Sequence, residues 1–203
     1  MTDEQLEATI RHAEAYSKTG HFAEAEASID EVLAALDESR ATGTHPHEDS
    51  HAGIHLRAKA LLALANTKTR SGNLDAALKV AERSLAIAEE YSFSEITAKA
   101  WNIIGNVHRS VGAYDTALTY FARSLAMHQT LGEISHAALV IGNIGVVYNS
   151  IGIYDKALEY FGRALAMYDE LDDASGKANI TGNLGTVYLN LGSYDTALEY
   201  FAT

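Results

Sequence analysis

Apolar residues recur at helical spacing along most of the chain, in short segments separated by polar breaks. One segment has apolar positions at Ile96, Ala100, Trp101, Ile104, Val107 and Val111, and the next has them at Tyr114, Ala117, Leu118, Phe121 and Leu125. Steps of three and four residues place such side chains on one face of an α-helix. The pattern therefore predicts pairs of amphipathic helices.

Two kinds of break separate these helices. The first, VGAYD at Val111, has a glycine directly after the expected helix, which suits a left-handed C-cap. The second, QTLGEIS at Gln129, is polar and ends with a serine that suits an N-cap. The helix pair is therefore the unit of the fold.

This unit repeats every forty residues. GAYDTALTYFARSLAM begins at Gly112, GIYDKALEYFGRALAM at Gly152 and GSYDTALEYFA at Gly192, and Gly72 keeps the same register. A weaker copy surrounds Gly20, which precedes Gly72 by fifty-two residues and so implies an insert of about twelve. A fixed period of this size predicts a stacked repeat protein.

We expect one repeat domain over residues 1–203, because each unit of such an array leans on its neighbours. The predicted repeats cover about residues 3–38, 52–91, 94–131, 134–171 and 174–203, with a histidine-rich insert at about 39–51. Hydrophobic residues make up 47% of the chain, and many are alanines, which favour closely packed helices. The predicted class is all-α.

The repeated residues resemble those of the tetratricopeptide repeat family. The resemblance covers most of the chain and rests on Trp101, Ile104, Gly105, Gly112, Tyr114, Ala117 and Phe121, on Ile144, Gly145, Tyr148, Gly152, Tyr154, Ala157, Phe161 and Ala164, and on Leu184, Gly185, Tyr188, Gly192, Tyr194, Ala197 and Phe201. It implies a right-handed α-α superhelix of about five helix-turn-helix repeats, the last incomplete.

Two features depart from the usual family pattern. The period is forty instead of thirty-four, and the chain has one proline, Pro46, where the family usually ends each unit with proline. The longer form is similar to the repeats of kinesin light chains, of Pins-type adaptors and of bacterial signalling proteins. Armadillo and HEAT repeats share the period, but they do not require glycine and alanine at these paired offsets.

Glycines in the middle of the first helices call for a packing explanation. Each costs about 1 kcal/mol relative to alanine in a helix, so something must offset it at Gly105, Gly145 and Gly185. We expect Ala117, Ala157 and Ala197 of the second helices to pack on these glycines. Phe121 and Phe161 would then wedge into the following repeat.

The resemblance also implies where a partner binds. In the family, the first helices line a concave groove that accepts extended peptides or short helices. Carried over to this chain, the groove residues are Lys59, Asn66, Arg70, Lys99, Asn102, Asn106, Arg109, Gly142, Asn143, Asn149, Asn179, Gly182 and Asn183.

The chemistry of this row suits a peptide backbone. Asparagine offers both donors and an acceptor, so a ladder of asparagines satisfies an extended peptide whatever its side chains. The basic residues of the N-terminal half favour acidic residues or a free carboxylate in the ligand. Gly142 and Gly182 are interpreted as room for the ligand's backbone. The alternative is an ordinary solvated helix face that requires small residues.

Net charge excludes some partners. Asp and Glu outnumber Lys and Arg by 27 to 15, which gives a net charge of −12 and disfavours nucleic acid. The chain has no cysteine and no apolar run of the length that a membrane span needs, so we expect a cytoplasmic protein with no membrane partner.

A histidine cluster lies in the insert, where His45, His47, His51 and His55 fall within eleven residues. Imidazoles at such spacing can bind zinc or copper, but Pro46, Gly43 and Gly53 indicate a loop without a second fixed pair of ligands. We therefore predict no metal and no cofactor.

No catalytic motif stands out either. GNIGVV and GNLGTV lie within predicted helices, and a dinucleotide fingerprint needs a strand before it. We predict a non-catalytic scaffold that binds a linear peptide of a protein partner. The alternative is a sensory, regulatory or oligomerisation module of a larger signalling protein. Leu198, Tyr200 and Phe201 of the short last helix lack cover, which predicts either a fragment of a longer chain or a homodimer through this helix.

Overall fold

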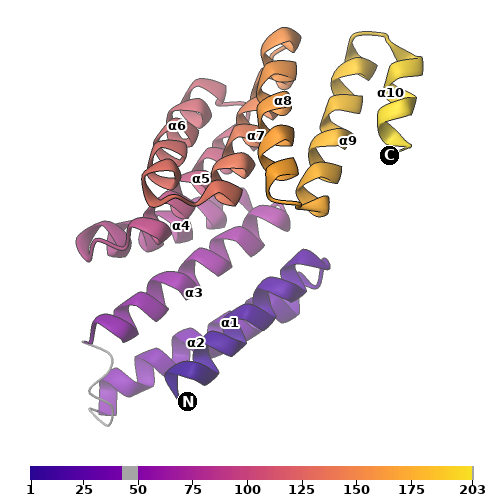
Figure 1. Cartoon of the computed structure of the whole chain (residues 1–203). Helices are drawn as coiled ribbons and strands as arrows, with labels where there is room; N and C mark the ends of the chain where they lie inside the picture. The colour runs from indigo at the N-terminus through magenta and orange to yellow at the C-terminus, as the bar shows by residue number, and fades with distance from the viewer. Residues whose placement is uncertain (43–49, 203) are drawn as a thin grey trace. The chain divides into compact units, whose positions relative to one another are not determined.

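The computed structural model describes residues 1–42 and 50–202, without the side chains of residues 39–42. The described residues form ten helices and no strand (Figure 1). They divide into two compact units, residues 1–111 and 112–203, and each unit is considered by itself. That the whole chain acts as one domain stays a prediction.

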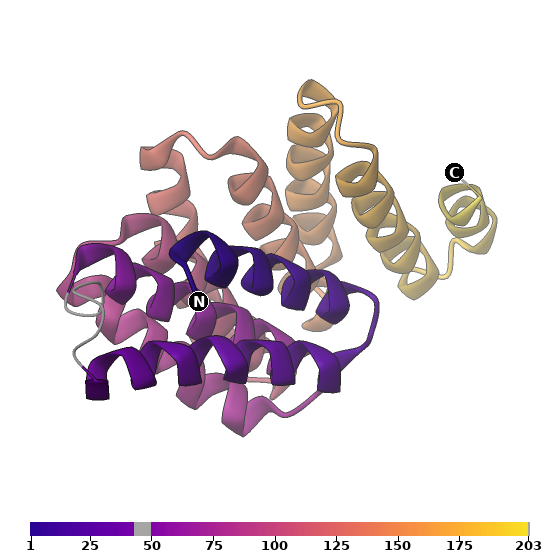
Figure 2. The ribbon, with the colours of Figure 1, turned by 90° about the horizontal axis from the view of Figure 1, so that it is seen from below.

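The first unit contains five helices. They are α1 (Asp3–Lys18), α2 (Phe22–Thr42), α3 (His51–Arg70), α4 (Leu74–Glu90) and α5 (Ser94–Ser110). Helices α1 and α2 pack on each other and both contact α3, as the two views in Figures 1 and 2 show. Helix α5 packs on α3 and α4.

The core of this unit is aliphatic and small. Its main cluster takes residues from α1, α2 and α3, among them Ile10, Ala13, Ile29, Val32 and Leu56. A second cluster joins Ala58, Ala88, Phe93 and Ile96. The close packing of helices that the alanine-rich sequence predicts is thus present in this unit.

The second unit also contains five helices. They are α6 (Tyr114–Leu131), α7 (Ile134–Ser150), α8 (Tyr154–Glu170), α9 (Ala174–Asn190) and α10 (Tyr194–Phe201). Each helix packs on the next one, and α7 also contacts α9. The core here contains large rings: Phe121 and Phe161 are fully buried, and Tyr148 stacks on Tyr160 with ring centroids 5.3 Å apart.

Left-handed residues end the helices in both kinds of turn. The glycines of the first kind, including Gly20, Gly72 and Gly192, have φ between 76° and 86°. The turns between repeats use Gly132, but also Ser92 and Asp172 with φ of 60° and 52°. Residues other than glycine are strained in this region. The repeat packing therefore keeps the left-handed turn even at Ser92 and Asp172, where the residue itself disfavours it.

The mid-helix glycines accommodate aromatic rings. A Cβ on Gly145 would lie 2.7 Å from a ring carbon of Phe161, and a Cβ on Gly185 would lie 2.7 Å from a ring carbon of Phe201. We expected alanine in this place, but the nearest group is the phenylalanine of the same repeat. Phe161 also belongs to the core cluster that contains Ile180 and Leu184 of the next repeat.

Candidate functional site

The predicted peptide-binding residues all lie on the first helices of the repeats. Within the first unit, α3 packs beside both α1 and α5, and within the second unit α7 packs beside α9. Lys59, Asn66 and Arg70 are on α3, and Lys99, Asn102, Asn106 and Arg109 are on α5. Gly142, Asn143 and Asn149 are on α7, and Asn179, Gly182 and Asn183 are on α9.

Two of the basic residues are paired with carboxylates. Lys59 Nζ lies 3.4 Å from Glu7 Oε1 of α1, and Lys99 Nζ lies 2.5 Å from Glu95 Oε1 one turn earlier in α5. Both lysine side chains stay about one third exposed, at 38% and 30%. An acidic ligand would therefore have to compete with two carboxylates that the chain itself supplies.

Arg70 is held by the end of α1. Its Nε donates to the carbonyl of Ser17 at 3.1 Å, and one terminal nitrogen donates to the carbonyl of Lys18 at 3.3 Å. Carbonyls in the last turn of a helix have no partner within that helix, and a cation is favourable there. Arg70 therefore caps the C-terminal end of α1, a contact that competes with any ligand for its guanidinium group.

The asparagines of α5 are linked to one another and to arginine. Asn106 Nδ2 donates to the carbonyl of Asn102 at 3.1 Å, and Arg109 Nε donates to Asn106 Oδ1 at 3.4 Å. Asn66, which lies forty residues before Asn106, is exposed on α3. This part of the row offers amide groups whose orientation is partly set by neighbours.

In the second unit the row contains no charged residue. Asn143 and Asn183, forty residues apart, are both half-buried on the adjacent helices α7 and α9, and Asn179 is exposed. Asn190 Nδ2 donates to Asn149 Oδ1 at 3.0 Å, so amides of the two helices reach each other directly. Each asparagine amide offers two donor hydrogens and an acceptor, the groups that an extended peptide backbone requires.

The two glycines of the row differ. Gly142 is buried, and a Cβ there would lie 2.8 Å from Cδ1 of Ile180 in α9, so close packing of two helices accounts for it. Gly182 has no heavy atom within 4 Å of its Cβ position. Only Gly182 thus leaves space beyond what helix packing uses.

Comparison with protein families supports the sequence resemblance. The family model described as tetratricopeptide repeat matches residues 56–130 and 135–203, well over half of the chain. The chain belongs to the tetratricopeptide repeat family. No curated protein sequence matches it.

Solved structures agree with this assignment. BtubC (BKLC) of P. vanneervenii is 25% identical with a TM-score of 0.69, and the match covers 94% of this chain and 74% of BtubC. A putative kinesin light chain with tetratricopeptide-like repeats from Podosopora anserina is 16% identical with a TM-score of 0.65, covering 100% and 94%. The Rap conjugation gene regulator of plasmid pLS20, solved with the Phr* peptide, is 14% identical with a TM-score of 0.79.

The Rap match covers 98% of this tetratricopeptide chain but 52% of the regulator. At this identity the likeness shows a shared fold. The chain is thus an all-α tetratricopeptide solenoid of the long type.

The described part of the histidine-rich segment packs on an aromatic ring. His51 and His55 each place their ring centroid 4.8 Å from that of Phe93, edge to face. Burial lowers the pKa of His55, and the nearby Lys59 lowers it further. The predicted insert, with His45 and His47, lies largely outside the described residues.

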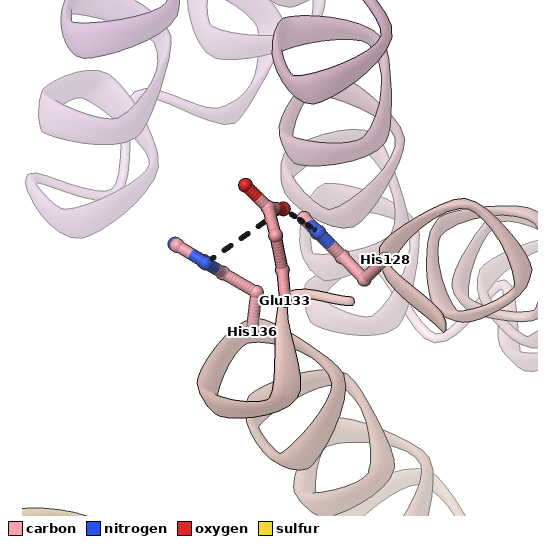
Figure 3. A group of neighbouring side chains, drawn as sticks. All are labelled: His128, Glu133 and His136. Carbon is pink, nitrogen blue, oxygen red and sulfur yellow. Dashed lines mark hydrogen bonds and ion pairs between the residues drawn. The ribbon is translucent and has the colours of Figure 1, made fainter. Parts of the chain in front are cut away.

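A different polar group, which the sequence pattern did not indicate, lies in the tetratricopeptide repeats of the second unit. His128 Nδ1 is 2.5 Å from Glu133 Oε2, and His136 Nδ1 is 3.9 Å from the same oxygen (Figure 3). The two imidazole rings stack, with centroids 5.0 Å apart. His128 is buried, with 1% of its side chain exposed, whereas Glu133 and His136 are partly open to solvent.

None of the helices in the described part of the chain is both long enough and apolar enough to cross a bilayer.

Proposed function

We propose that this tetratricopeptide chain is a non-catalytic scaffold that binds an extended peptide segment of a protein partner along its first helices. The peptide would lie across α3 and α5 in the first unit, or across α7 and α9 in the second. The single observation that carries the proposal is that exposed and half-buried amides lie on adjacent first helices within each unit, Asn66 and Asn106 on α3 and α5, and Asn143 and Asn183 on α7 and α9.

The Rap regulator supports the choice of ligand. It has the same fold over nearly the whole of this chain, and it was solved with a bound peptide. The amides of this chain favour recognition of the ligand's backbone over its side chains. Glu7 and Glu95 already lie against Lys59 and Lys99, so these lysines contribute less to a preference for acidic ligands.

A peptide library tests the proposal. The purified chain should select peptides with a common pattern. For a ligand that lies across α7 and α9, Asn143→Ala together with Asn183→Ala should weaken binding about 5- to 150-fold, since two lost hydrogen bonds contribute about 1–3 kcal/mol in all. Lys79→Ala on the exposed face of α4 is the matched control and should leave the affinity unchanged. Equal affinity in the asparagine variant and the control would place the ligand elsewhere.

A second candidate function, self-association, rests on the exposed side of α10. Tyr194, Leu198 and Phe201 are 65%, 65% and 52% exposed, and apolar groups gathered on one short helix are typical of an interface. The partner in this case would be a second copy of the chain, within a sensory or regulatory protein. A cytoplasmic location stays a prediction in both cases.

Light scattering over a range of protein concentrations tests self-association. The chain should change from monomer to dimer as its concentration rises, and Leu198→Glu should keep it monomeric because a charge cannot be buried unpaired. Val111→Glu, at another highly exposed apolar residue, is the control and should still dimerise. A monomeric mass at all concentrations would refute this candidate.

A further inference from the structure

The backbone of the α6–α7 turn brings His128 and Glu133 together. Gly132 adopts φ of 70°, its N–H donates to the carbonyl of Gln129 at 3.2 Å, and the N–H of Glu133 donates to the carbonyl of His128 at 2.9 Å. This pair of bonds is a Schellman motif, in which the first and last residues of the turn usually make an apolar contact. Here a histidine and a glutamate occupy those two positions.

Equivalent positions in the preceding repeat show that the fold does not need ionisable groups there. Forty residues earlier, Ala88, Phe93 and Ile96 replace His128, Glu133 and His136, and all three belong to one apolar cluster. Forty residues later the positions hold Tyr168, Asp173 and Gly176, and the Tyr168 ring lies against Gly176. Among the turns in the described part of the chain, this one alone collects two imidazoles and a carboxylate.

The carboxylate of Glu133 also differs in what it does for its helix. Asp173, at the equivalent place, caps α9 by accepting a hydrogen bond from the N–H of Gly176 at 2.9 Å. Glu133 precedes α7 in the same way but makes no such bond. Its carboxylate extends toward the two histidines instead (Figure 3). Helix α7 therefore lacks the stabilisation that a side-chain N-cap provides.

The geometry fits a small cation with few ligands. One ligand atom from each residue lies within 4.8 Å of the others. Tetrahedral zinc with ligands at about 2.0–2.1 Å separates them by about 3.4 Å. The distances of 2.5 Å and 3.9 Å from Glu133 Oε2 lie on either side of that value, so rotations of the side chains suffice.

Space adjoins two of the three residues. A hollow of about 180 Å³ is lined by His128 and Glu133, together with Ile134, Ala137 and Met167, but not by His136. His128 is buried, whereas His136 is partly open to solvent.

We propose that His128, Glu133 and His136 form a site for Zn²⁺ or a similar divalent transition metal, which links the end of α6 to the start of α7. Two imidazoles and one carboxylate are a known ligand set for zinc, and imidazole favours such metals over Mg²⁺ and Ca²⁺, which prefer oxygen. The proposal is independent of peptide binding, and it differs from the expectation of no metal drawn from the sequence.

Zinc titration against a chromophoric chelator, on chain without an affinity tag, tests this site. The chain should take up one Zn²⁺ that raises its melting temperature, because the metal binds the folded state and not the unfolded one. His136→Ala and Glu133→Asp should each lower the affinity at least about tenfold, since even changes around the ligands cost about that much. Aspartate keeps the fold, because Asp173 occupies the same position as a helix cap.

The histidine-rich segment provides the control. A variant with His45, His47, His51 and His55 all changed to alanine removes the competing imidazoles of this segment and should keep the high-affinity site. Loss of zinc binding in this variant, unchanged affinity in His136→Ala, or no binding by the unaltered chain would each overturn the proposal. In those cases His128 and Glu133 would be a hydrogen-bonded pair without a metal.

Discussion

At the scale of single residues, the glycines within α7 and α8 differ in whether a neighbouring side chain packs against them. Gly145 faces the fully buried ring of Phe161, whereas Gly162 of α8 is exposed and has no heavy atom within 4 Å of its Cβ position. Both lower the helix propensity by about 1 kcal/mol relative to alanine. Only the first has a packing reason for doing so.

Gly145→Ala should therefore destabilise the chain although alanine is the better helix former. The new Cβ would lie 2.7 Å from the ring, and overpacking of a core costs about 1–3 kcal/mol, more than the propensity gained. Gly162→Ala, the matched control, should stabilise by up to about 1 kcal/mol. Chemical denaturation measures both, and a stabilising Gly145→Ala would contradict the packing described here.

The sequence could identify these glycines but not their partners. The forty-residue period showed that Gly145 and Gly185 are equivalent, and a mid-helix glycine indicates close approach. Ala157 and Phe161 lie one turn apart on the same face of the second helix. Which of them meets the glycine depends on how far the two helices are shifted along their axes, and the period does not give that shift.

At the scale of helices, long-range polar contacts hold the first helices in place. Arg70 of α3 bonds to two carbonyls of α1, and Lys68 Nζ of the same helix lies 2.9 Å from Glu26 Oε2 of α2. The helices themselves followed from the apolar pattern. These contacts did not, because they join residues 42 to 53 positions apart in the sequence.

Arg70→Ala should lower the free energy of unfolding by about 1 kcal/mol, because two carbonyls at the end of α1 lose a charged donor. This loss of stability is small for a charged hydrogen-bond donor, because part of the arginine side chain faces solvent. Arg83→Ala, an exposed arginine of α4, is the control and should change stability by less than about 0.5 kcal/mol. Equal effects in a denaturant titration would mean that Arg70 is free for a ligand.

At the scale of the whole molecule, the repeat period and the residues that it aligns predicted the tetratricopeptide repeat family, which the family model confirms. Repeats make equivalent positions easy to align, and the amide row on the first helices could be found in this way. The group of His128, Glu133 and His136 was missed because it interrupts the pattern. Comparing the residues on either side of each inter-repeat turn would have revealed it.

Mapping a selected peptide onto the isotope-labelled chain by amide nuclear magnetic resonance tests the central claim most directly. Peptide binding should shift amide signals of the first helices, in α3 and α5 or in α7 and α9, and leave α4 and α8 unshifted. Shifts centred on α4 or α8, or confined to α10, would contradict binding along the first helices.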